Sequence, residues 1–373
     1  MFLPKAFKNG GILFSSIILI SVSILSCICF RLLLQCRERY GGGYGELGAA
    51  VGGPKLRIMI LSSIALSQIG FVCAGMIFIA ENLFTFLDAV TPNHTHPLSI
   101  IALISLQIII LVPLALIRNI TRLGPSAMLA DMFIFIGLIY IWYYDIATLS
   151  HSGVHPTVQL FNPSAWTLTI GSSIFTFEGI GLLLPIQSSM MHPQHFSKLL
   201  YLVMVIITLI FTSIGALCYA TFGSSTSVEI ISNYPQTSPL VNAVQFLYSM
   251  AVLAGTPVQL FPAARILETT LFGEQASGKR SRATKWYKNA LRIGTTLMCG
   301  IIAIAGASDL DKFVALIGSF ACVPLVYIYP ALLHYRAIAE TRGEKAWDVA
   351  VMAVGFGAMV YTTAITISSW ARQ

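Results

Sequence analysis

Charged residues are scarce in this sequence of 373 residues. Only 10% are Asp, Glu, Lys or Arg, whereas 56% are hydrophobic, and the mean hydropathy is +0.80. Soluble domains carry roughly 25% charged residues, so the composition excludes a soluble globular protein and predicts an integral membrane protein. The formal net charge of +7 is better explained by basic residues held on one face of a membrane than by a nucleic-acid partner.

The sequence also lacks the motifs that carry catalysis, metal binding or disulfide pairing. Its 7 cysteines lie in or beside apolar runs without metal-ligand spacing. It has no Ser-His-Asp order, no Gly-rich phosphate loop and no pair of neighbouring carboxylates. The first apolar run is longer than the apolar region of a cleavable signal peptide. We therefore expect no enzymatic activity, no cofactor and no metal site.

Ten apolar runs are expected to cross the bilayer as helices, each of which needs about 20 residues. All but four of the 22 lysines and arginines lie in the loops on one side of these runs, the exceptions being Lys5, Lys8, Lys312 and Arg372. Basic loops stay in the cytoplasm, so that side is expected to be cytoplasmic. The ten runs are 11–34, 58–79, 98–117, 123–144, 166–190, 199–222, 240–261, 290–305, 313–333 and 349–370.

The run at 166–190 contains residues that interrupt a helix. Glu178 lies near its centre, between apolar residues, followed by Gly179, Gly181 and Pro185. Glycine loosens the backbone, and proline removes a donor and clashes with the preceding turn. Backbone groups freed at membrane depth are tolerated only inside protein or beside a wet cavity. The pattern predicts a helix broken at about 178–181, which is how secondary transporters build a binding site in mid-membrane.

A short internal sequence similarity supports the same architecture. The start of the chain, MFLPKAF, resembles LLLPIQS at 182–188, and four spans follow each copy. Repeats of five helices with inverted topology build many transporters. We therefore expect a single all-α transmembrane domain, with repeat 1 at about 1–144, repeat 2 at about 166–333 and an extra helix at about 349–370. The first copy is expected to be a partial helix whose beginning would precede Met1.

Several motifs resemble the amino acid/auxin permease family, and within it the fungal vacuolar amino acid transporters. The resemblance covers essentially the whole chain. It is carried by FLPKAFKNGG at 2–11 and FTFEGIG at 175–181, with support from SQIGF at 67–71, TPVQLFP at 256–262 and GSF at 318–320. It implies a leucine-transporter-type bundle that moves neutral amino acids across the vacuolar membrane with proton coupling. The family's glycine motif before Leu3-Pro4 is absent, which implies truncation at the N-terminus.

The candidate site residues cluster around the expected break. Glu178 is the candidate proton carrier and the candidate partner of the substrate ammonium group, because an intramembrane acid is costly and is usually functional; its alternative is a structural acid. Gly179, Ile180 and Gly181 would let backbone amides bind the substrate carboxylate, and the alternative for the glycines is close helix packing. The remaining candidates for substrate contact are Phe175, Phe177, Ser67, Gln68 and Ser319.

These remaining candidates have equally ordinary explanations. Phe175 and Phe177 would shape the pocket or simply fill the core. Ser67, Gln68 and Ser319 would contact substrate or form hydrogen bonds between helices. Asn93 begins the glycosylation sequon Asn-His-Thr on the side opposite the basic loops.

The expected function is secondary active transport, with an amino acid, protons and membrane lipid as partners. Two alternatives remain open. One is a membrane-embedded amino acid sensor that keeps the site without transporting, and the other is an inactive truncated gene product.

Overall fold

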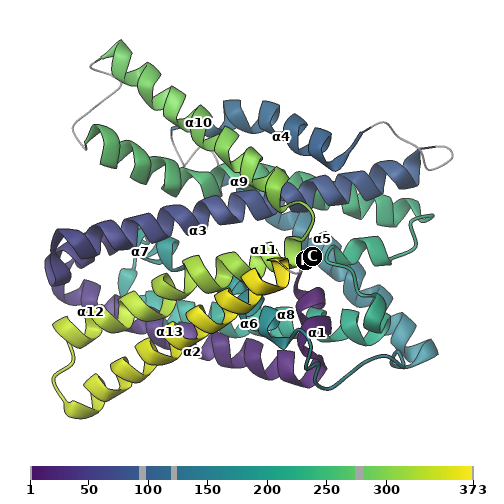
Figure 1. The fold of residues 1–373 in the computed structure, drawn as a ribbon, viewed down its shortest axis with the longest axis horizontal. Coiled ribbons are helices and arrows are strands. Elements are labelled where there is room, and N and C mark those ends of the chain that lie inside the picture. The colour runs from purple at the N-terminus through teal and green to yellow at the C-terminus, as the bar shows by residue number, and fades with distance from the viewer. Residues whose placement is uncertain (1, 92–97, 119–123, 274–280, 372–373) are drawn as a thin grey trace. The chain divides into compact units, whose positions relative to one another are not determined.

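The computed structural model describes residues 2–91, 98–118, 124–273 and 281–371, and over these ranges it contains helices and no strands (Figure 1). Nine of the described helical segments are long and apolar enough to cross a membrane. The chain is therefore a multi-pass membrane protein. The predicted sequon at Asn93 lies outside the described residues.

Each of the ten predicted spans overlaps a helical segment, although the run at 166–190 and the run at 313–333 each comprise more than one helix. The run predicted at 98–117 forms the helix α4 (Ile100–Ala115), which has 16 residues and is shorter than the other nine. At about 1.5 Å per residue it spans about 24 Å, less than the roughly 30 Å of the hydrocarbon core. Within the described residues, nine of the ten expected full-length spans are therefore present, and the tenth is a shorter helix.

The helices form two compact units, each built from separate parts of the chain. The first unit comprises 1–2, 68–153 and 225–313, and the second comprises 3–67, 154–224 and 314–373. Two helices, α3 (Tyr44–Val90) and α11 (Leu310–Ile317), contribute residues to both units.

The first unit is formed by α4, α5, α9 and α10 together with the second part of α3. In it α5 packs along α9, and α4 packs on both α9 and α10. The bounds are Gly124–Ser152 for α5, Pro239–Phe272 for α9 and Arg282–Gly306 for α10.

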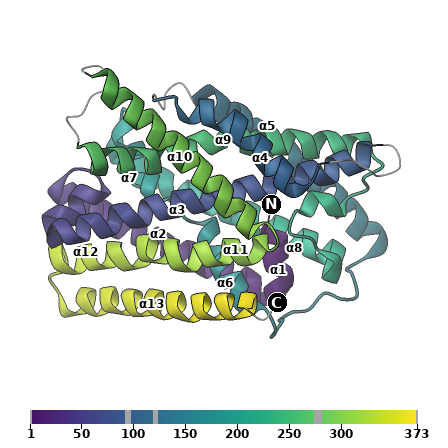
Figure 2. The same cartoon turned by 45° about the horizontal axis from the view of Figure 1, so that its top comes forward.

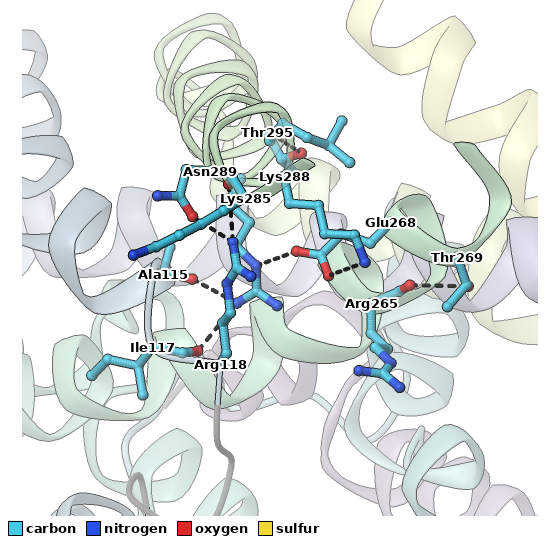
Figure 3. Close-up of polar contacts among 12 residues, drawn as sticks. Ala115, Ile117, Arg118, Arg265, Glu268, Thr269, Lys285, Lys288, Asn289 and Thr295 are labelled. Atoms are coloured by element: carbon cyan, nitrogen blue, oxygen red, sulfur yellow. Dashed lines mark hydrogen bonds and ion pairs between the residues drawn. The ribbon is translucent and has the colours of Figure 1, made fainter. Parts of the chain in front are cut away.

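A buried ionic cluster joins three helices of the first unit (Figure 3). Arg292 on α10 donates from Nε to Glu268 Oε1 on α9 at 2.6 Å, and the two residues are 2% and 3% exposed. Lys288 Nζ lies 3.9 Å from Glu268 Oε2. Arg292 also donates to the carbonyl oxygens of Ala115 and Ile117 at 2.8 and 3.1 Å. These bonds satisfy carbonyls at the end of α4, where a cation is favoured by the helix dipole.

The second unit contains the predicted broken helix. Its core is built by α2, α6, α8 and α12, and α12 runs beside α13 (Figure 2). Its elements are α1 (Leu3–Gly10), α2 (Ile12–Tyr40), the first part of α3, α6 (Trp166–Thr176), α7 (Ile180–Ser189), α8 (Phe196–Phe222), the π-helical turns η6 (Gly318–Cys322) and η7 (Pro324–Ile328), α12 (Tyr329–Ala337) and α13 (Arg342–Ala371).

Two glycines allow the sharp changes of direction in this unit. Gly11, with φ 86°, separates α1 from α2, and Gly53, with φ 76°, interrupts α3 before Pro54. Both glycines have the positive φ that other residues rarely adopt. The short helix α1 packs on α6 and α8, and Thr169 on α6 donates a hydrogen bond to the Ala6 carbonyl at 2.8 Å.

Candidate functional site

The apolar run at 166–190 is interrupted in its middle. Helix α6 ends at Thr176 and α7 begins at Ile180, leaving Phe177, Glu178 and Gly179 outside both helices (Figure 1). The predicted break is therefore confirmed. It begins one residue earlier than expected, and Gly181 already belongs to α7.

Local hydrogen bonding explains how the chain leaves one helix and enters the next. The amide of Glu178 donates to the Phe175 carbonyl at 3.4 Å, which tightens the last turn of α6. The amide of Leu182 donates to the Gly179 carbonyl at 3.1 Å and closes the first turn of α7. Farther along α7, Pro185 lacks an amide hydrogen and cannot bond to the carbonyl of Gly181.

The break leaves polar groups without partners among the described residues. The amides of Gly179, Ile180 and Gly181 form no hydrogen bond there, as is usual for the first turn of a helix. The Oε1 atom of Glu178 is buried and also lacks a hydrogen-bond partner. Buried polar groups nearly always have partners, so this cluster of donors and one acid is suited to a polar ligand.

Two uncharged side chains of the second unit lie within electrostatic range of the acid. The Glu178 carboxylate interacts electrostatically with Tyr44, at the start of α3, and with Cys322, at the end of η6. Tyr44 is held in place because its hydroxyl donates to the Leu325 carbonyl in η7 at 2.7 Å. Cys322 thus belongs to one π-helical turn and Tyr44 is bonded to the other, and such turns occur frequently at functional sites.

Two contacts hold the halves of the broken helix in position. The Arg37 guanidinium on α2 donates to the Leu184 carbonyl at 2.5 Å and to Gln187 Oε1 at 2.9 Å, so it stabilises the C-terminal end of α7. On α6, Gly171 lies so close to α11 that an added Cβ would approach the Ala315 carbonyl oxygen to 2.5 Å. Gly318 in η6 is packed equally tightly against Gly171.

The glycines of the break itself are not packed in this way. A Cβ at Gly179 would meet no described atom within 4 Å, and one at Gly181 would make ordinary contact with Ile64 at 3.6 Å. Gly179 has φ −172°, an extended conformation open to any residue. Close helix packing, the alternative raised from the sequence, therefore does not explain Gly179.

The other sequence-predicted residues have varied surroundings. Phe177 is buried, with its ring centroid 6.1 Å from that of Phe211 on α8. Phe175 is half-buried on the last turn of α6. Ser67 donates to the Ile64 carbonyl at 3.0 Å, within its own helix. Core packing thus accounts for the Phe177 ring, and a backbone bond accounts for the Ser67 hydroxyl.

Ser319 and Gln68 differ in whether their polar side-chain atoms have hydrogen-bond partners. The Ser319 hydroxyl donates to the Ala315 carbonyl at 2.8 Å and accepts a hydrogen bond from Thr363 on α13 at 3.2 Å, so a bond between helices accounts for it. Gln68 belongs to the first unit, where its Oε1 atom is buried without a partner among the described residues. The structure therefore brings Phe175, Phe177, Glu178, Gly179, Ile180 and Gly181 together at the break and leaves Ser319 engaged elsewhere.

Sequence reasoning missed Arg37, Tyr44 and Cys322. Arg37 is one of many basic residues at the same ends of the spans, and nothing in its local sequence marks a bond to a carbonyl 147 residues away. The available signal was Pro185 together with Gly179 and Gly181, which predict a short helix whose end needs a partner. For metal binding, the described residues contain no group of three or more His, Cys, Asp or Glu side chains that would hold an ion.

Comparison of the sequence with known proteins identifies its family. Residues 1–368 match the family model described as transmembrane amino acid transporter protein. The chain is 46% identical over 377 residues to vacuolar amino acid transporter 3 of Saccharomyces cerevisiae, a match that covers 100% of this chain and 54% of the relative. It is 43% identical over 366 residues to vacuolar amino acid transporter 3 of Schizosaccharomyces pombe, covering 98% and 55%.

A third relative, vacuolar amino acid transporter 4 of Saccharomyces cerevisiae, is 39% identical over 396 residues, covering 97% of this chain and 55% of the relative. The chain spans about half the length of these curated relatives. The matches confirm the resemblance inferred from the motifs at 2–11 and 175–181. Since the family model covers nearly the whole sequence, the chain belongs to the transmembrane amino acid transporter family.

Proposed function

We propose that this protein is a secondary active transporter that moves neutral amino acids across the vacuolar membrane, driven by protons. The observation that carries the proposal is the break between α6 and α7, with its free amides and unpartnered acid. The family and the names of its relatives, which are vacuolar amino acid transporters, favour an amino acid as the substrate and the vacuole as the location.

The polar groups of the break suit the two charges of an amino acid. The free amides at the start of α7 form an anion site, since amides and the helix dipole both favour negative charge there. This end would bind the substrate carboxylate. The end of α6 carries the opposite partial charge, and together with Glu178 it would bind the ammonium group. A zwitterion therefore matches the site at both ends.

The preference for neutral side chains rests on the surroundings of Glu178. Its electrostatic neighbours in the second unit, Tyr44 and Cys322, carry no formal charge in their protonated forms. The cation Arg37, at the other end of α7, is engaged by Leu184 and Gln187. A third charge on the substrate would therefore lack a counter-charge among these groups, and an uncompensated charge is costly away from water.

Proton coupling is assigned to Glu178. An acid inside a transmembrane bundle is expensive to maintain and commonly serves a proton pathway. Binding a proton would remove the charge that holds the ammonium group, so substrate release and proton uptake would be linked at one carboxylate.

The proposed architecture is an inverted repeat of five helices, with repeat 1 at about 1–144, repeat 2 at about 166–333 and an extra helix at about 349–370. Each compact unit draws segments from both proposed repeats, as intertwined repeats would. The helix α1, which contains the first Leu-Pro pair, corresponds in this scheme to α7, which contains the second. Transport would proceed by movement of one bundle against the other.

Uptake into vesicles tests the proposal directly. Purified protein is reconstituted, a pH gradient is imposed, and the accumulation of labelled neutral amino acids is measured one at a time. We expect accumulation that is abolished by a protonophore. Saturable substrate binding without flux would contradict transport and support the alternative of an amino acid sensor.

Replacement of Gly179 by leucine separates substrate binding from helix packing. The space beside Gly179 is open and its backbone conformation is allowed for leucine, so the variant is expected to fold normally. The added side chain would cover the free amides, and uptake should fall about tenfold or more, as expected when hydrogen bonds to a charged group worth about 1.5–3 kcal/mol are lost.

Gly171→Ala is the matched comparison, because its Cβ would collide with Ala315. That variant should lose about 1–3 kcal/mol of stability through overpacking, measured as a lower unfolding temperature in detergent. If Gly179→Leu leaves substrate affinity and uptake unchanged, the free amides do not bind the substrate.

A further inference from the structure

A cavity outside the break lies entirely within the second unit. It has a volume of about 770 Å³ and is bounded by α2, α8, the end of α12 and the start of α13. Two of its lining residues, Ser23 on α2 and Thr208 on α8, share a hydrogen bond of 2.6 Å. None of the residues at the break between α6 and α7 lines it, so it is separate from the proposed substrate site.

The walls formed by α2 and α8 are aliphatic and exposed. Ile20 and Ile24 are 43% and 58% exposed, and Val205 and Leu209 are 58% and 66% exposed. Both helices are apolar enough to cross a membrane, so these side chains face hydrocarbon and not water. An open aliphatic groove at this depth is complementary to an acyl chain.

One end of the cavity is charged. Arg31 on α2 lines it, is exposed, and forms no hydrogen bond or ion pair with the described residues. It follows Ile12, the first residue of α2, by 19 positions, which corresponds to about 28 Å of helix. This length is close to the roughly 30 Å of a hydrocarbon core. Arg31 therefore lies at the membrane–water interface, on the side that the basic loops mark as cytoplasmic.

Acidic groups line the same end. Glu344 Oε2 accepts hydrogen bonds from the amides of Glu340 and Thr341, each at 3.0 Å. Asp348 Oδ2 lies 2.7 Å from His334 Nδ1, and its Oδ1 is buried without a partner among the described residues. Trp347, 50% exposed, stands beside them, as is typical of aromatic residues at a membrane interface.

We propose that this groove binds a phospholipid of the cytoplasmic leaflet with an ethanolamine headgroup. The phosphate binds Arg31, the primary ammonium group is attracted to Glu344 and Asp348, and an acyl chain lies along the aliphatic walls of α2 and α8. A headgroup with negative charge alone would satisfy Arg31 but would face two carboxylates. The presence of both signs at one end of the cavity favours a headgroup that carries both. The buried Oδ1 of Asp348, which has no partner among the described residues, favours ethanolamine over choline, because a primary ammonium group donates hydrogen bonds and a trimethylammonium group does not.

Native mass spectrometry of the full chain in detergent tests the headgroup. Phosphatidylethanolamine, phosphatidylcholine and phosphatidylglycerol are added in turn, and the fraction of protein that retains one lipid is measured. We expect the ethanolamine lipid to be retained best. Arg31→Gln should lower its affinity about fivefold, the effect of losing one well-placed exposed charge pair.

Arg265→Gln is the matched control for Arg31. Arg265 is likewise an exposed arginine near the basic end of a helix, but it belongs to α9 in the first unit and does not line the cavity. Its replacement should leave lipid retention unchanged. Equal effects of the two replacements would overturn the assignment of the headgroup site. So would retention of phosphatidylglycerol or phosphatidylcholine equal to that of phosphatidylethanolamine.

The acyl-chain groove has its own test. Val205→Trp fills the groove, whereas Leu202→Trp adds the same side chain on the same helix outside it; both native residues are 58% exposed. Lipid retention should fall only with Val205→Trp, while the unfolding temperatures of the two lipid-free variants stay alike. Unchanged retention in Val205→Trp would show that the groove does not hold the chain.

Discussion

Replacement of Glu178 by glutamine is expected to reduce proton-driven amino acid uptake about tenfold or more. Glutamine has nearly the same shape but cannot exchange a proton or attract the substrate ammonium group. Interactions with a charged partner are worth about 1.5–3 kcal/mol, which is at least about tenfold in affinity or rate. The residual flux should no longer depend on the pH gradient.

The fold should survive this replacement. The Oε1 atom of Glu178 has no hydrogen-bond partner among the described residues, so an amide there breaks no observed network. The measurements are uptake into vesicles at several pH gradients and the unfolding temperature of the purified variant. Glu38→Gln, which removes an exposed acid from α2 in the same unit, is the control and should behave as the unaltered protein. Unaltered flux and pH dependence in Glu178→Gln would exclude Glu178 as the proton carrier.

Replacement of Glu268 by glutamine is expected to cost roughly 3–5 kcal/mol of the free energy of unfolding. The change leaves the Arg292 guanidinium, which is 2% exposed, without its carboxylate partner. Removing one member of a buried ion pair is destabilising by about this amount, because the remaining charge stays buried and uncompensated. Denaturant titration in mixed micelles measures the loss.

A less deeply buried ion pair in the same unit provides the control. Lys312 Nζ lies 3.3 Å from Asp309 Oδ1, with side chains 12% and 18% exposed. Lys312→Gln should cost less than about 1 kcal/mol. The double variant Glu268→Leu/Arg292→Leu should recover much of the loss, because it removes the two buried charges that lie 2.6 Å apart. A Glu268→Gln effect as small as that of Lys312→Gln would mean that the cluster does not join α4, α9 and α10 energetically.

The membrane class, the helical segments and the position of the break were all predictable from the sequence. These features depend on neighbouring residues: an apolar run must form its own backbone hydrogen bonds in lipid, and the acid, glycines and proline at 178–185 locally disfavour a helix. Boundaries were less predictable. α3 extends over 47 residues, from Tyr44 to Val90, whereas hydropathy marks only its apolar part at 58–79.

The tertiary structure alone decided which side chains far apart in the sequence contact one another. Arg37 and Arg292 belong to the same set of basic residues that marks the cytoplasmic face, yet one binds the end of α7 and the other pairs with a buried glutamate. The loop-charge rule counts such residues without distinguishing them. Likewise, the sequence alone marks Ser319 as a candidate site residue, whereas the structure shows that its hydroxyl accepts a hydrogen bond from Thr363. Local patterns record which segments enter the membrane, whereas the pairing of side chains depends on which helices pack together, and that is set by contacts across the whole chain.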